Sequence, residues 1–235
     1  MENTNDANSK AESAESHLDK GNALYDQGEY ESAVSEYDKA INLNPNFAAA
    51  YLKRGNAKDK IGQHFEAISD YDEAIRLDPD DPNAYYNRGV VKGSLGHPEA
   101  AIRDYDEAIR LNPNHAAAYN NRGNAKDDIG QHFEAISDYD SVIRLDPNDT
   151  DAYYNRGIVK VKLGQPEAAI RDFNEAIHLN PSDVKAYANR GIAQRKLGLT
   201  DDAKRDYQTA LDLAEKSGDE ELKSRIMRLM ERLAD

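Results

Sequence analysis

Four asparagines recur at intervals of 34 residues: Asn87, Asn121, Asn155 and Asn189. An asparagine amide carries both a donor and an acceptor, so it can pair with a peptide N–H and a peptide C=O together. A row of such amides would recognise the backbone of an extended chain and tolerate many side chains. The alternative is that asparagine is a neutral, soluble residue copied along with the string Asn-Arg-Gly.

Catalytic chemistry has little support in this chain. There is no cysteine, which excludes a disulfide framework and a cysteine-based metal site or nucleophile. Of the six histidines, two occupy one copied position (His64, His132) and three stand where a near-identical segment has Gln, Asp or Arg (His97, His115, His178). The motifs of nucleophilic triads, phosphate-binding loops and metal sites are missing. We therefore expect no enzyme activity, no catalytic or metal-binding residue and no cofactor.

The net charge of the chain argues against nucleic acid as a partner. The net charge is -14, with 44 acidic residues against 30 Lys and Arg. Such a surface repels phosphate backbones, whose binding depends on cations that release counterions. The polar N-terminus does not resemble a signal peptide, and no run of about 18 apolar residues exists to span a bilayer. We expect a cytoplasmic protein with protein or peptide partners, without nucleic acid or membrane partners.

A strict 34-residue period organises the whole chain. Counted from Ala14 as position 1, glycine recurs at positions 8 and 15, alanine at 20, an aromatic residue at 24, leucine at 30 and proline at 32. Glycine just past a helix and proline near its start are helix boundary signals, so each unit predicts two helices. A glycine at position 8, inside a helix, costs about 1 kcal/mol relative to alanine. We expect close approach of the paired helix to offset this cost, with the alanine at position 20 opposite the glycine.

This pattern resembles the tetratricopeptide repeat. The resemblance covers residues 14–217 and departs from the family mainly at position 4, where Tyr replaces Trp. It implies an all-α fold, a right-handed superhelical α-solenoid of helix-turn-helix repeats. The expected divisions are a disordered segment (1–13), six repeats (14–47, 48–81, 82–115, 116–149, 150–183, 184–217) and a C-terminal capping helix (219–234).

The capping helix is predicted from helical spacing after Gly218. Asp219 is a plausible N-cap, and the apolar residues that follow it share one face. These are Leu222, Ile226, Leu229, Met230 and Leu233. We expect the helix to cover the flank of the sixth repeat as a solubilising lid, in preference to binding a partner.

The resemblance also implies which positions line a concave groove, namely 2, 5, 6, 9, 12 and 13. The asparagines occupy position 6 and resemble the asparagine ladder of the O-GlcNAc transferase repeats. Position 5 holds no Lys or Arg, which argues against the carboxylate clamp of heat-shock chaperone adaptors. The expected groove residues are Asn87, Asn121, Asn155, Asn189, Lys53, Tyr86, Tyr154, Asn120, Asn56, Asn124, Lys162, Lys185, Arg195 and Lys196.

Rows of charge allow two interpretations. Arginine recurs at position 7, lysine at position 11 in four repeats, and aspartate at position 23. They form either a structural ladder between neighbouring helices or a binding surface, and we favour the ladder.

An internal duplication indicates where function lies. Residues 48–81 differ from 116–149 at six positions, and 82–115 differ from 150–183 at eleven; seven of these differences fall at groove positions. The scaffold is therefore copied more faithfully than the groove. We expect an adaptor or scaffold that binds an extended peptide or protein segment, with acidic residues favoured at the basic C-terminal end of the groove. The alternatives are a self-assembling homo-oligomeric scaffold and, more distantly, the regulatory arm of a larger enzyme.

Overall fold

The structure, a computed structural model, describes residues 13–233, and all of its regular elements in that range are helices. Contacts divide the chain into two compact units, Met1–Pro113 and Asn114–Asp235. The expected disordered N-terminal segment lies outside the described residues except for Ser13. Unit 1 contains α1 (Ala14–Asp26), α2 (Tyr30–Leu43), α3 (Ala48–Lys60), α4 (His64–Leu77), α5 (Pro82–Ser94) and α6 (Pro98–Leu111). Unit 2 contains α7 (Ala116–Asp128), α8 (His132–Leu145), α9 (Thr150–Lys162), α10 (Pro166–Leu179), α11 (Val184–Lys196), α12 (Thr200–Ser217) and α13 (Glu220–Glu231).

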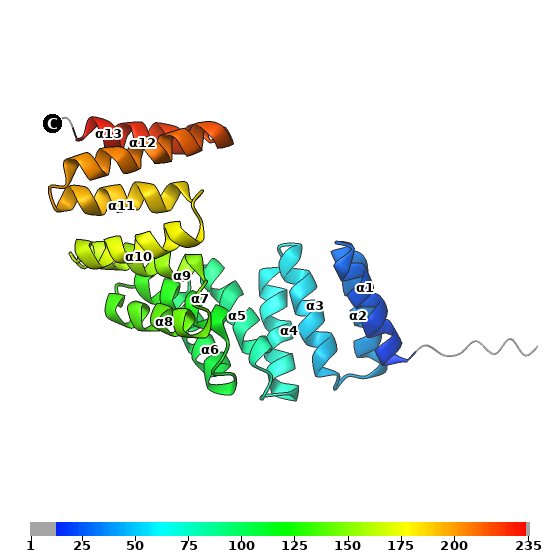
Figure 1. Cartoon of the computed structure of the whole chain (residues 1–235). Helices are drawn as coiled ribbons and strands as arrows, with labels where there is room; N and C mark the ends of the chain where they lie inside the picture. The colour runs from blue at the N-terminus through cyan, green and yellow to red at the C-terminus, as the bar shows by residue number, and fades with distance from the viewer. Residues whose placement is uncertain (1–12, 234–235) are drawn as a thin grey trace, which may run out of the picture. The chain divides into compact units, whose positions relative to one another are not determined.

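Within each unit, successive helices pack against one another in pairs (Figure 1). In unit 1 the pairs are α1–α2, α3–α4 and α5–α6, and the second helix of each pair also contacts the first helix of the next. Unit 2 repeats this arrangement and adds α13 against α12. The prediction of an all-α solenoid built from helix pairs, with a capping helix, is confirmed.

Glycine ends the first helix of each pair. Gly62 and Gly96 have φ of 78° and 79°, in the left-handed region that a Cβ atom disfavours. Proline opens α6 and α10 at Pro98 and Pro166, where its missing N–H has no helical partner to lose. Local sequence therefore fixes the turns on which the pairs fold.

The glycines at position 8 make room for an aromatic ring. A Cβ atom on Gly89 would lie 2.8 Å from Cε1 of Tyr105, the aromatic residue at position 24 of the same pair. The expectation that alanine at position 20 lies opposite this glycine is wrong. Ala101 instead faces position 12, where a Cβ on Gly93 would lie 3.7 Å from the Ala101 Cβ. The Tyr105 ring thus occupies the space that a side chain at position 8 would need.

The last helix closes the apolar core of unit 2. Ile226 is fully buried with Tyr207 and Ala210 of α12. The other four apolar residues predicted for this face also pack there, and Asp219 Oδ1 accepts a hydrogen bond of 2.9 Å from the Leu222 N–H. Hydrophobic burial and a capped N-terminus together hold α13 on the flank of the sixth repeat.

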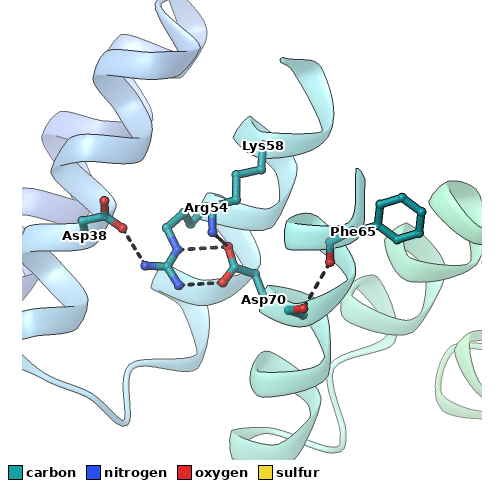
Figure 2. Close-up of polar contacts among 6 residues, drawn as sticks. Asp38, Arg54, Lys58, Phe65 and Asp70 are labelled. Carbon is teal, nitrogen blue, oxygen red and sulfur yellow. Dashed lines mark hydrogen bonds and ion pairs between the residues drawn. The ribbon is translucent and has the colours of Figure 1, made fainter. Parts of the chain in front are cut away.

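A network of charges joins successive pairs (Figure 2). Arg54 of α3 forms two hydrogen bonds with Asp70 of α4, Nε–Oδ2 of 2.9 Å and Nη2–Oδ1 of 2.6 Å. Its Nη1 reaches Asp38 of the preceding pair at 2.6 Å, and Lys58 Nζ lies 2.8 Å from Asp70. The guanidinium also lies 5.3 Å from the centre of the Tyr51 ring, a cation–π distance. These contacts favour the structural interpretation of the rows of charge.

Candidate peptide-binding surface

The first helices of the repeats in unit 2 line an open hollow of about 610 Å³. Asn120 and Asn124 of α7, Tyr154 and Asn155 of α9, and Lys185 of α11 all border it. These five residues come from three successive repeats, and the sequence analysis expected each of them in the groove. The hollow also borders Leu222 of α13.

Unit 1 has a smaller hollow of about 230 Å³ on its own first helices. The expected groove residues Asn56, Tyr86 and Asn87 line it, together with residues that the sequence analysis did not select. The additional ones are Tyr25, Asp59, Lys60, Tyr71 and Val90. Lys53, also expected in the groove, is exposed on α3 and does not border this hollow.

The asparagines at position 6 are engaged through their amide nitrogen. Asn87 Nδ2 donates to Asn56 Oδ1 at 2.9 Å, and Asn189 Nδ2 donates to the Lys185 carbonyl at 2.9 Å and to the Tyr154 hydroxyl at 3.0 Å.

Asn155 Nδ2 makes longer contacts of 3.4 and 3.5 Å to Asn120 and Asn124. Within the described residues, Oδ1 of Asn87, Asn155 and Asn189 accepts no hydrogen bond. Asn121 lies half-buried on α7. The short internal bonds therefore fix the amides of Asn87 and Asn189, and the longer contacts hold that of Asn155 less firmly. The carbonyl oxygens of all three are available.

The asparagines at position 9 have a structural role that sequence reasoning missed. Tyr71 donates its hydroxyl to Asn56 Oδ1 at 3.0 Å, and Tyr139 donates to Asn124 Oδ1 at 2.7 Å. Burial raises the pKa of both tyrosines, so their hydroxyls remain protonated donors. Asn56 and Asn124 thus anchor the buried aromatic residue of their own repeat as well as bordering a hollow.

The basic residues expected at the C-terminal end are not equally available. Lys162 Nζ lies 2.6 Å from Asp127 Oδ2, so its charge is neutralised within unit 2. Lys196 Nζ and Arg195 Nη1 contact the backbone carbonyls of Val161 and Arg232 at 3.2 and 3.4 Å. Lys185 is exposed, and Arg225 of α13 lines two small hollows with it.

Arg225 is a further residue that the sequence analysis did not select. It lies on the predicted capping helix, of which only the apolar residues were assigned a role from sequence. Its position beside Lys185 depends on how α13 packs. Tyr25 and Asp59 had a weak signal, since both occupy position 12, one of the groove positions. Burial is the main cause that raises the pKa of Tyr25, followed by Tyr30, Asp59 and Asp26.

No group of three or more His, Asp or Glu side chains within residues 13–233 is placed to hold a metal ion. Among the same residues, no helix combines the length and apolar character needed to cross a membrane.

Family models match the chain over nearly all of its repeats. A model described as "TPR repeat" matches residues 21–62 and 60–96. Models described as "Tetratricopeptide repeat" match 82–115, 104–137, 130–188 and 184–217. Together the matches run without a gap from residue 21 to residue 217. No curated protein sequence matches the chain significantly.

Solved structures with the same fold are numerous. YrrB, described as a TPR protein with an unusual peptide-binding site, is 29% identical, with a TM-score of 0.66 over 75% of this chain and 91% of that one. MamA is 28% identical, with a TM-score of 0.68 over 70% of this chain and 96% of that one. A tetratricopeptide repeat protein from Parabacteroides merdae is 20% identical, covers 94% and 93%, and has a TM-score of 0.71, which is a likeness of fold.

Proposed function

The chain belongs to the tetratricopeptide repeat family, and on this premise we propose that the first helices of its repeats bind an extended peptide or protein segment. Family and fold make it a protein-interaction module, of a kind that is generally non-catalytic. The proposal adds that the partner is bound as an extended segment. The peptide-binding site named for YrrB is a property of that protein, and its similarity to this chain supports the proposal.

The observation that carries the proposal is the row of oriented carbonyl oxygens at position 6. Asn155 of α9 and Asn189 of α11 each tie Nδ2 to the protein and leave Oδ1 without an internal partner. An oxygen fixed in this way can accept a hydrogen bond from a peptide N–H with little loss of side-chain entropy. Backbone recognition then comes mainly from acceptors, because the amide nitrogens of Asn155 and Asn189 each already contact two acceptors within the protein.

The α11–α13 end of this surface favours an acidic residue of the bound segment. Lys185 and Arg225 border the same hollows, and neither side chain has an ion pair or hydrogen bond within the described residues. Asp219, Glu221 and Arg228 also line one of these hollows. Three cations against two carboxylates leave one positive charge in excess, so the preference is for one acidic group. Arginine beside lysine provides charge-assisted hydrogen bonds to a carboxylate.

The test uses a peptide selected against the protein from a random-peptide display library. Alanine at all four position-6 asparagines should weaken its binding at least tenfold, with helical circular dichroism preserved. The control is the pair Glu66→Ala and Glu134→Ala, which alters exposed residues of α4 and α8 and should leave the affinity unchanged. Unchanged affinity in the asparagine variant would show that the position-6 asparagines do not bind the peptide.

A second candidate is self-association. Phe65 and Phe133 occupy the same repeat position and are 72% and 68% exposed. The repeats that follow them have Glu99 and Glu167 there. Burial of such rings between copies would be favourable. Light scattering after gel filtration should then show an oligomer that the two alanine substitutions dissociate. A monomer at high protein concentration would count against this candidate.

A further inference from the structure

The duplicated segments place equivalent aspartates at the ends of α3 and α7. Asp59 Oδ1 lies 2.8 Å from His64 Nδ1, and Asp127 Oδ1 lies 2.8 Å from His132 Nδ1. In both units, one carboxylate oxygen is thus held by the histidine that opens the following helix. The two sites differ in what meets the second oxygen.

In unit 2 the protein supplies its own cation. Lys162 of α9 places Nζ 2.6 Å from Asp127 Oδ2, the distance of a charge-assisted hydrogen bond. The Asp127 side chain is 13% exposed. Both oxygens of this carboxylate are satisfied, and its charge is neutralised.

In unit 1 the corresponding cation is missing. Ser94 stands where unit 2 has Lys162, and Gly93 stands where it has Val161. The Ser94 hydroxyl donates back to the Val91 carbonyl at 2.8 Å. Asp59 Oδ2 has no hydrogen bond to any residue within 13–233, and the Asp59 side chain is 29% exposed.

The hollow of about 230 Å³ in unit 1 is bordered by Asp59. Three tyrosines also line it, Tyr25 from α1, Tyr71 from α4 and Tyr86 from α5. Aromatic faces attract cations within about 6 Å of the ring. Lys60 is the one cation among the lining residues, and its side chain is exposed. A carboxylate oxygen with no partner beside aromatic rings is suited to a primary ammonium group.

We propose that Asp59 and these three tyrosines form a lysine-binding subsite, in which a lysine of the bound segment supplies the ammonium that Lys162 supplies in unit 2. The duplication itself identifies the ligand, because an equivalent carboxylate with the same histidine partner holds a lysine. The subsite deepens the proposed function and rests on it for the source of the lysine. The bound segment should therefore carry a lysine where it contacts unit 1.

The first experiment titrates the protein with Nα-acetyl-lysine methylamide and follows the NMR signals of Tyr25, Asp59 and His64. These signals should shift with the lysine probe and not with the matching norleucine compound. Asp59→Asn should abolish the shifts, and Ser94→Lys should abolish them by filling the site from within. Lys162→Ser should create a second responsive site at Asp127.

Two results would overturn the subsite. Equal shifts with the norleucine compound would show that the ammonium is not recognised, and undiminished shifts in Ser94→Lys would show that the probe binds elsewhere. Ser94→Lys retains every lining residue, so it remains informative if Asp59→Asn fails to fold.

The second experiment separates this inference from the proposed function. Calorimetry compares a display-selected peptide that contains lysine with the same peptide carrying norleucine, and we expect the replacement to weaken binding roughly tenfold. A peptide that requires the position-6 asparagines but is indifferent to norleucine would overturn the subsite alone. A lysine probe that binds at Asp59 when no peptide binds to the asparagine row would uphold the subsite and overturn the proposed function.

Discussion

The duplicated segments, residues 48–115, which lie in unit 1 up to Pro113, and residues 116–183 of unit 2, agree in their buried charges and differ at their surfaces. Arg54 Nη2 lies 2.6 Å from Asp70 Oδ1, and Arg122 Nη2 lies 2.5 Å from Asp138 Oδ1. At the surface, Asp59 faces an open hollow whereas Asp127 holds Lys162. One scaffold thus carries two different surfaces.

Energetics explain why the two kinds of position diverge. Removing one partner of a buried ion pair leaves an uncompensated charge in a poorly solvated place, which costs about 3 kcal/mol or more. An exchange such as Lys162 for Ser94 acts on a solvated pair, which contributes about 1 kcal/mol or less. The surface can therefore change while the fold is retained.

The largest expected effect comes from the shared network. Asp70→Ala and Asp138→Ala should each lower the free energy of unfolding by about 3 kcal/mol, because each leaves an arginine and a lysine beside a buried cavity. Asp70 and Asp138 are 4% and 3% exposed. Urea unfolding followed by circular dichroism measures the loss. Asp72→Ala, with a side chain that is 57% exposed, is the control and should cost less than about 1 kcal/mol; equal losses at Asp70 and Asp72 would contradict the buried-network explanation.

The two glycines of α5 should respond in opposite directions. Gly89→Ala places a methyl group 2.8 Å from the buried Tyr105 ring and should destabilise by about 2 kcal/mol. Gly93→Ala meets only contacts of 3.7 Å and should stabilise by about 1 kcal/mol through helix propensity. Thermal unfolding of the two variants compares them directly. A destabilising Gly93→Ala would show that this position belongs to the scaffold, although its counterpart in the other segment is Val161.

The smallest expected effect distinguishes two buried tyrosines. Tyr71→Phe removes the hydroxyl that donates to Asn56 and should cost about 1 kcal/mol. Tyr105→Phe should be close to neutral, because the residue at position 9 of its repeat is Val90 and the equivalent of Tyr105 in unit 2 is Phe173. Denaturant midpoints of both variants give the comparison. Equal costs would show that the asparagine at position 9 does not anchor the ring.

Much of the fold could be predicted, because the period repeats every local signal. Gly96, Pro98 and Gly218 mark helix boundaries through backbone conformation alone, which depends on a few neighbouring residues. The neighbour of Gly89 was predicted wrongly. The glycine at position 8 and the alanine at position 20 are both small, which suggested that they contact each other, whereas the Tyr105 ring fills the space beside Gly89.

The candidate site could be predicted less completely. Periodicity identified position 6 and hence Asn87, but not the hydrogen bond from Asn87 to Asn56. Arg225 was not predicted because its neighbours come from another helix. Lys162 was assigned to the binding surface because its charge is visible in sequence, whereas its pairing with Asp127 is not.

The sequence by itself determined the helix pairs and their order, because these follow from the 34-residue period and from local backbone preferences. Only the tertiary structure decided which polar groups are already satisfied. Asn87 and Asn56 are 31 residues apart, and Lys162 and Asp127 are 35 apart. Whether such groups meet depends on packing between repeats and on side-chain reach, so the open carboxylate of Asp59 and the occupied one of Asp127 became distinguishable only in three dimensions.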